Sequence, residues 1–100
     1  MVIIFVRLRV RPEKRKELLQ TLHSINEQVR NESGCLHSGF YQSVEDENDF
    51  LAVGEWANQQ DLDEHLGSDI FTVLLGAGSL MSWPPEIAIH TVNRSTELEA

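Results

Sequence analysis

The stretch EWANQQDLDEHLGSDIF, from Glu55 to Phe71, combines the signals of a strand end, a helix start and a helix break. Trp56 closes an apolar run that is typical of a strand. Asn58 offers a side-chain oxygen to the free N–H groups of a helix start, which is the role of an N-cap residue. Leu62 and Leu66 follow at helical spacing. The stretch therefore predicts a strand, a turn and a short helix in succession.

A second helical segment is expected after Gly67, capped by Ser68 or Asp69. Its apolar residues are Phe71, Val73, Leu74 and Leu75. Glycines at 76 and 78 and the pair Pro84-Pro85 then interrupt the helical pattern. A last strand is predicted over residues 86–93, with Ile87 and Ile89 on one face.

Working back toward the N-terminus, alternate apolar residues predict a strand over residues 2–10. Residues 12–32 predict an amphipathic helix that begins at a proline, and Gly34 supplies the left-handed conformation common after a helix end. The apolar stripe of this helix consists of Leu18, Leu22, Ile25 and Val29, widened by Leu19.

Two further strands, over residues 35–44 and 50–56, flank an acidic hairpin loop at 45–49. In the first of them, Leu36, Phe40 and Val44 are expected on one face and His37 and Tyr41 on the other.

The predicted order β-α-β-β-α-β places the fold in the α+β class. It is typical of the ferredoxin-like arrangement, in which a four-stranded antiparallel sheet carries both helices on one face. The other face would expose Ile3, Phe5 and Tyr41. Because a monomer would leave this apolar surface in water, the pattern predicts a homodimer formed through the open sheet face.

Composition narrows the class of protein. One hundred residues predict a single domain, over residues 1–95, with a C-terminal tail at 96–100. A net charge of −8 argues against nucleic-acid partners and against binding to anionic membranes. One cysteine cannot form an internal disulfide, and neither a signal peptide nor a membrane-spanning run is recognised, so a cytoplasmic location is expected.

Few residues suggest chemistry by their spacing. No nucleotide-binding motif is found, and none of the four histidines lies at a metal-ligand spacing from another His or Cys, so no metal site is expected. Cys35 is interpreted as a small buried hydrophobic residue. His65 lies beside the Leu62–Leu66 stripe, where it would either transfer protons in a cleft or only border the core. Trp56 is likewise either a packing residue or a platform for a ligand.

Three segments resemble the antibiotic biosynthesis monooxygenase (ABM) domain family: RVRPEK at 9–14, NESGC at 31–35 and EWANQQDLDEHLGSDIF at 55–71. The most specific part is the pattern W-x(5)-L-x-x-H-L-x-S-x-x-F, and the likeness to the small quinol monooxygenases is the strongest. The pattern residues here are Trp56, Leu62, His65, Leu66, Ser68 and Phe71.

The resemblance implies a dimeric α+β barrel with a pocket between the sheet and the helices of each subunit. It implies oxidation of a phenolic or quinol-type aromatic by O₂ without a flavin, haem or metal cofactor, because an electron-rich phenolate can itself reduce O₂. In such a site His65 would handle protons, and Trp56, Phe71 and Leu62 would shape the substrate cavity.

The sequence departs from this family at several positions. The haem-degrading branch has an asparagine on the first strand and a histidine in the last helix, where this chain has Val6 and Leu75, and neither side chain can ligate iron. Many relatives carry a glutamate two residues before the tryptophan, where this chain has Gly54. Glu55 is predicted on the opposite face of the strand and does not replace that glutamate.

Three hypotheses about function follow. The first is a cofactor-independent monooxygenase acting on a small aromatic or quinol. The second is a dimer that binds or isomerises a small molecule without oxygen chemistry. The third is a dimerising module in which Leu62, Leu74 and Trp56 fill the space between sheet and helices.

Overall fold

A four-stranded antiparallel sheet forms one layer of the molecule, in the strand order β2-β3-β1-β4. The computed structural model describes residues 1–99. Its strands are β1 (Val2–Arg9), β2 (Cys35–Gln42), β3 (Asp49–Trp56) and β4 (Glu86–Thr91). Its helices are α1 (Arg15–Arg30), α2 (Gln59–Leu66) and α3 (Asp69–Gly76), with 3₁₀ turns η1 (Pro12–Lys14) and η2 (Ala77–Leu80). This order and pairing confirm the predicted ferredoxin-like arrangement.

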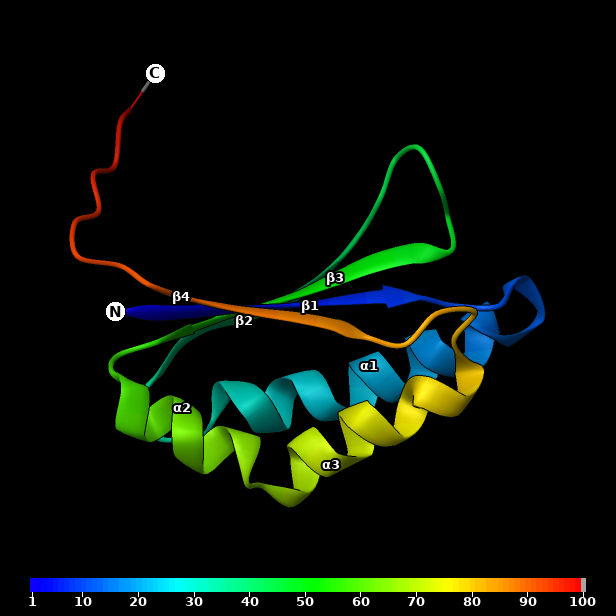
Figure 1. Ribbon diagram of the computed structural model, residues 1–100, viewed down its shortest axis with the longest axis horizontal. Helices are drawn as coiled ribbons and strands as arrows, with labels where there is room; N and C mark the ends of the chain where they lie inside the picture. Colours follow the sequence, from blue (N-terminus) through cyan, green and yellow to red (C-terminus); the bar gives the residue numbers. More distant parts are fainter. Residues whose placement is uncertain (100) are drawn as a thin grey trace.

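All three α-helices lie under the same face of the sheet (Figure 1). Side chains alternate along β1, so that one set points into the core between sheet and helices and the other points away. The predicted stripe of α1 is buried against the inward set, as expected for an amphipathic helix. The inward residues of β1 are Val2, Ile4, Val6 and Leu8, and those of α1 are Leu18, Leu22, Ile25 and Val29.

Helix starts and ends follow the predicted capping residues. The side chain of Asn58 accepts the backbone N–H of Asp61 at 2.9 Å and begins α2. Helix α1 is shorter than predicted, because its first turn is the separate 3₁₀ turn η1 and its last helical residue is Arg30. Gly34 has φ +80°, as expected of the glycine after this helix.

The predicted faces of β2 are wrong at both ends of the strand. A bulge lies between Cys35 and His37, and the extra residue shifts the alternation of side chains. Leu36 is therefore 60% exposed, and Val44 lies beyond the strand in the solvent, whereas Phe40 packs against the core. The bulge turns Cys35 toward the core, although this thiol is only partly buried and not fully enclosed as predicted.

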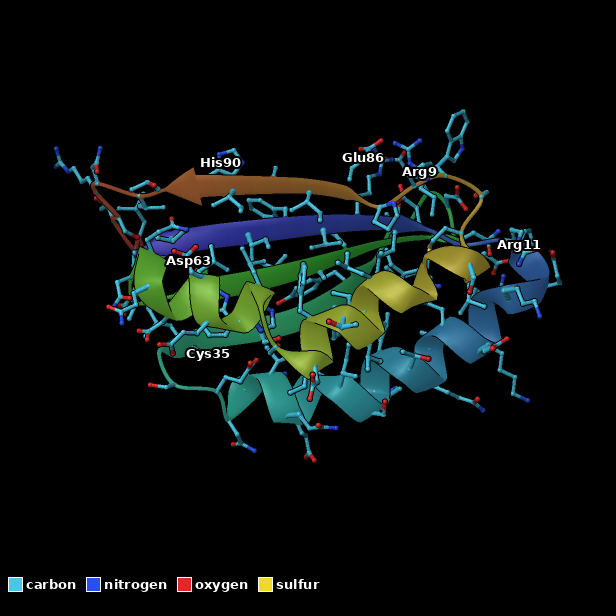
Figure 2. The ribbon with its side chains drawn as sticks, turned by 60° about the horizontal axis from the view of Figure 1, so that its bottom comes forward. Arg9, Arg11, Cys35, Asp63, Glu86 and His90 are labelled. Atoms are coloured by element: carbon cyan, nitrogen blue, oxygen red, sulfur yellow. The ribbon has the colours of Figure 1, made fainter. Side chains whose placement is uncertain are left out.

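Strand β4 is an edge strand with exposed side chains on both faces. Ile87 and Ile89 pair with Val6 and Ile4, so they share the helix-facing side, yet both are more than 40% exposed. Figure 2 shows β4 at the margin of the sheet, where Glu86 and His90 point away from the helices. The strand ends at Thr91, two residues before the predicted end, and residues 92–99 form no helix or strand. Ala100, in the predicted tail, lies outside the described residues.

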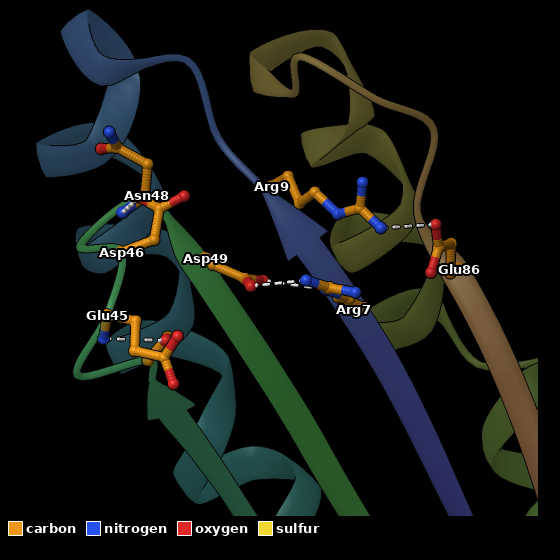
Figure 3. A network of polar contacts seen from close by, with 8 residues as sticks. Arg7, Arg9, Glu45, Asp46, Asn48, Asp49 and Glu86 are labelled. Atoms are coloured by element: carbon orange, nitrogen blue, oxygen red, sulfur yellow. Dashed lines mark hydrogen bonds and ion pairs between the residues drawn. The ribbon is translucent and has the colours of Figure 1, made fainter.

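The face of the sheet opposite the helices carries partly buried apolar residues, and ion pairs between charged side chains lie among them. Arg7 donates two hydrogen bonds to the Asp49 carboxylate, at 3.0 and 2.7 Å, and Arg9 pairs with Glu86 at 2.8 Å (Figure 3). The hydrogen bond from Arg7 raises the pKa of that guanidinium and lowers the pKa of Asp49. Over residues 1–99, no helix has both the length and the apolar character needed to cross a membrane.

Candidate active site

His65 lies on the buried face of α2. The sequence predicted a stripe of Leu62 and Leu66 with His65 at its edge. In the structure Leu62 and His65 are the buried residues of the helix, three positions apart, and Leu66 is only partly buried. His65 is 7% exposed. An imidazole so enclosed requires polar partners, because burial of an unpaired polar group is unfavourable.

The partner of His65 is Glu32. The Nδ1 atom of His65 lies 2.8 Å from Oε2 of Glu32, and the two side chains are 8% and 21% exposed. Because an ionised carboxylate can only accept hydrogen bonds, Nδ1 carries the hydrogen and Nε2 is the nitrogen that can take up a proton. The carboxylate would also stabilise the imidazolium formed by that uptake. The hydrogen bond to Glu32 thus fixes the orientation of the imidazole ring.

The turn that carries Glu32 packs directly on the start of α2. The backbone N–H of Ala57 donates to the carbonyl of Gly34 at 2.8 Å. A Cβ on Gly34 would collide with the carboxyl group of Asp61, and the positive φ of Gly34 also favours glycine. This contact between residues distant in sequence places Glu32 beside His65. The sequence prediction omitted Glu32 as a site residue, although it lies in the NESGC segment at 31–35 and two residues before the turn glycine.

Two aromatic rings enclose the imidazole. Trp56 is stacked on His65, with ring centroids 4.6 Å apart and an angle of 27° between the planes. Phe71 meets the imidazole edge-on, with centroids 5.3 Å apart. Trp56 is 1% exposed, and its Nε1 atom has no hydrogen-bond partner within residues 1–99. A buried N–H donor without a partner is rare in folded proteins and marks a position where a ligand or water oxygen would bind.

Ser68 joins the two helices that position these rings. Its hydroxyl donates to the carbonyl of His65 at 2.6 Å and accepts the backbone N–H of Phe71 at 3.2 Å. The same oxygen therefore bonds to the last turn of α2 and caps α3. This accounts physically for the spacing of His65, Ser68 and Phe71 in the sequence.

The space between these residues and the sheet is a small, mainly apolar cavity of about 30 Å³. It is lined by Trp56, His65 and Phe71 and by residues of β1, β2 and α1, including Ser38. The volume suffices for a water molecule but not for an aromatic ring, since a cavity that binds benzene has about 150 Å³. Leu62 is fully buried but does not line this cavity. Trp56, Leu62 and Leu74 are all buried between the sheet and the helices.

Gly54 determines how much of this space remains open. It faces the cavity from β3, opposite Ile4 of β1. A Cβ at this position would lie 2.9 Å from Nε1 of Trp56 and 3.0 Å from Cγ2 of Ile4, which is closer than packed atoms allow. The glycine thus leaves the space beside the unpaired indole N–H, at the position where the family pattern has a glutamate.

The two positions compared with the haem-degrading branch lie in different surroundings. Val6 lines the cavity, whereas Leu75 is 43% exposed on the outer side of α3. Within residues 1–99, no three side chains of His, Cys, Asp or Glu form a group that could hold a metal ion. Burial and the nearby Glu32 charge raise the pKa of the Cys35 thiol, so this cysteine is a poor nucleophile at neutral pH.

Comparison with known proteins places these features in a family. A sequence profile described as antibiotic biosynthesis monooxygenase matches residues 1–74. The uncharacterized protein sll1783 of Synechocystis is 26% identical over 98 residues, which are 97% of this chain and 67% of that protein. YcnE of Bacillus subtilis, named as a candidate monooxygenase, is 26% identical over 88 residues, or 87% of this chain and 93% of YcnE.

A solved structure shows the same fold. It is a protein of Deinococcus radiodurans described as a candidate antibiotic biosynthesis monooxygenase, and the match covers 100% of both chains with a TM-score of 0.90. Sequence identity to it is 22%, so the likeness concerns the arrangement of the chain and not its activity.

Proposed function

This chain belongs to the antibiotic biosynthesis monooxygenase family, and from that premise we propose that it oxidises a small phenolic or quinol-type aromatic with O₂. The observation that supports this proposal is the Glu32–His65 pair, buried under Trp56 beside a cavity on the helix side of the sheet. His65 would act as the base that forms a phenolate, and the buried N–H of Trp56 would donate a hydrogen bond that stabilises it.

The first step is proton transfer. Nε2 of His65 accepts the phenolic proton, and Glu32 stabilises the resulting imidazolium through Nδ1. The N–H of Trp56 donates to the substrate oxygen as negative charge develops there. The apolar lining of the cavity strengthens both interactions, because charges are poorly screened where water is excluded.

The second step is oxidation, in which the substrate supplies the electrons. For a hydroquinone, the phenolate reduces O₂ and the two combine at a ring carbon to form a peroxide. The O–O bond then breaks. One oxygen remains bonded to the ring carbon as a carbonyl, and the other leaves as water after it takes the proton held by His65. The balance is hydroquinone plus O₂ giving hydroxyquinone plus water, so the substrate supplies all the electrons and no external reductant is consumed.

The test is oxygen consumption with a panel of hydroquinones and anthrones. His65→Gln keeps the size and a donor for Glu32 but removes the base, and we expect the rate to fall about 10²–10⁴-fold. Glu32→Gln should lower it less, because the base remains. Glu64→Gln removes a charge from the exposed side of α2 and serves as the matched control. Oxygen uptake no faster than the uncatalysed reaction across the panel would reject the proposal.

A proton-transfer isomerase is the second candidate, because the Glu32–His65 pair alone could move a proton beside a carbonyl without O₂. Polar carbonyl metabolites would then raise the melting temperature of the protein without oxygen consumption. Under anaerobic conditions in D₂O, the carbonyl ligand should gain deuterium with wild-type protein but not with His65→Gln. A ligand that gains deuterium only in air would count against this candidate.

We also propose that the functional form is a homodimer joined through the open sheet face. Ile3, Phe5, Leu51 and Val53 lie on that face and are only partly buried in the single chain. A second copy would cover them and complete the barrel expected of this family. Dimer formation would leave the cavities on the helix side of both sheets.

A further inference from the structure

A groove of about 300 Å³ lies between α1 and β2, outside the His65 cavity. Its polar lining comes from His23, Asn26 and Arg30 of α1 and from Gln42 of β2. The apolar lining includes Leu22 and Phe40. No carboxylate lines the groove, although the chain has 16 Asp and Glu residues. The groove is thus a locally basic and amide-rich site on an acidic protein.

Phe40 lies at the boundary between the groove and the cavity, because it lines both. It is partly buried and lies on edge strand β2. Beside it, the hydroxyl of Ser38 in the cavity wall donates to the Asn26 side-chain oxygen in the groove wall at 3.1 Å. Phe40 and the Ser38–Asn26 hydrogen bond therefore both lie at the boundary between the two spaces.

Arg30 carries a positive charge that has no carboxylate partner among residues 1–99. Its Nε donates to the backbone carbonyl of Ser38 at 3.1 Å, which fixes the guanidinium at the end of the groove. No ion pair to Arg30 is found in residues 1–99, whereas Arg7, Arg9, Lys14 and Arg15 each have a carboxylate partner. A fixed guanidinium without a carboxylate partner is suited to bind a carboxylate of a ligand.

We propose that the α1–β2 groove is the outer half of the substrate site and binds an anionic carboxylate arm on Arg30. Phe40 moves aside so that the aromatic ring of the same molecule reaches His65. The cavity is too small for a ring, and Phe40 borders both this cavity and the larger groove, which could supply the room. The placement of the ring rests on the proposed function, whereas the binding of the carboxylate does not.

The carboxylate site is tested by calorimetry with a matched pair of probes, 6-hydroxy-2-naphthoate and 2-naphthol. We expect Arg30→Gln to weaken binding of the naphthoate about tenfold and to leave naphthol binding unchanged. Lys16→Gln removes an equal charge from an exposed position on the same helix and should change neither. Equal losses for both probes in Arg30→Gln, or none for either, would overturn the proposed carboxylate site.

The partition is tested by substitutions in two directions. Phe40→Ala opens the wall and Phe40→Trp enlarges it, so the association rate of 2-naphthol should rise several-fold in the first and fall in the second. Stopped-flow detection of the fluorescence of 2-naphthol itself, excited above the absorption range of tryptophan, measures both rates. Phe40→Leu serves as a milder opening if the alanine variant unfolds. Rates that do not change with the size of residue 40 would overturn the role of Phe40.

These outcomes are separable from those of the oxygen-uptake assay. Binding of the naphthoate that depends on Arg30, without oxygen consumption by wild type, would retain the groove and reject the monooxygenase. Oxygen consumption that depends on His65, with binding of the naphthoate that ignores Arg30, would do the reverse.

Discussion

At the scale of single residues, glycines decide where the chain can approach itself. Gly34 joins the turn of Glu32 to α2, and Gly54 leaves the space beside the Trp56 indole. In both cases a Cβ on the glycine would come too close to a neighbouring side chain, Asp61 for Gly34 and Trp56 for Gly54. The geometry of the site thus depends on the lack of a Cβ at these two positions as well as on its polar groups.

Gly34→Ala should destabilise the protein because of both the positive φ and the contact with Asp61. The left-handed conformation alone costs about 1–2 kcal/mol for a residue with a Cβ. Urea unfolding should therefore show a loss of at least that size, and Gly34→Ala/Asp61→Ala should recover only part of the steric cost, because the Cβ of residue 61 would still lie 2.6 Å from the new Cβ. Gly76→Ala is the control, since a Cβ there meets nothing within 4 Å and should not destabilise α3. Equal stability of Gly34→Ala and wild type would contradict this account of the turn.

At the scale of elements, adjacent strands and helices are locked by a few polar contacts. Ser68 holds α2 and α3 through the His65 carbonyl and the Phe71 N–H. On the other side of the sheet, Arg7 and Asp49 join β1 to β3 through two parallel hydrogen bonds. The two contacts differ in their response to pH, because only the second contains a titrating group.

The Asp49 contact should make stability depend on pH in acid. Arg7 lowers the pKa of Asp49 in the folded protein, so the unfolded chain binds this proton more readily. The stabilisation is present above the ordinary pKa of an aspartate, about 3.9, and is lost as the pH falls through the lower folded value. The difference in unfolding free energy between wild type and Asp49→Asn should therefore shrink below about pH 4.

Urea titrations from pH 2.5 to 7, at one protein concentration, measure this difference. Glu45→Gln, in the exposed loop before β3, is the control and should follow wild type throughout. A gap between wild type and Asp49→Asn that stays constant down to pH 2.5 would show that the ion pair does not stabilise the fold.

At the scale of the whole molecule, the two faces of the sheet have different roles. The helices cover one face and enclose the cavity, while the other carries apolar residues and ion pairs without a covering layer (Figures 1 and 3). Because large apolar surfaces are rarely left in water, the uncovered face is the natural place for a second copy.

Light scattering at micromolar concentration should give twice the 11.4 kDa mass of one chain. Val53→Glu places a charge among the apolar residues of the open face and should yield monomers, since Val53 lies directly opposite Phe5 on β1. Leu98→Glu makes the same change at a position that is 90% exposed after β4 and should leave the dimer intact. A wild-type monomer would refute the proposed dimer.

The sequence by itself determined the order of strands and helices, the stripe of α1 and the cap at Asn58, and it narrowed the cap of α3 to Ser68 or Asp69. These features are local, because the period of apolar residues and the chemistry of a cap involve residues only a few positions apart. It also brought Trp56, His65 and Phe71 to one region, since their spacing follows from one strand, one turn and two short helices.

Only the tertiary structure decided the pairing of His65 with Glu32, the small volume of the cavity and the division of the space by Phe40. Glu32 and His65 are 33 positions apart, and their contact depends on how the turn at Gly34 docks on α2. The bulge in β2 likewise changes which residues face the core without a clear local signal. Such features arise from packing between distant segments, where shifts smaller than an atom determine which groups meet and which spaces stay open.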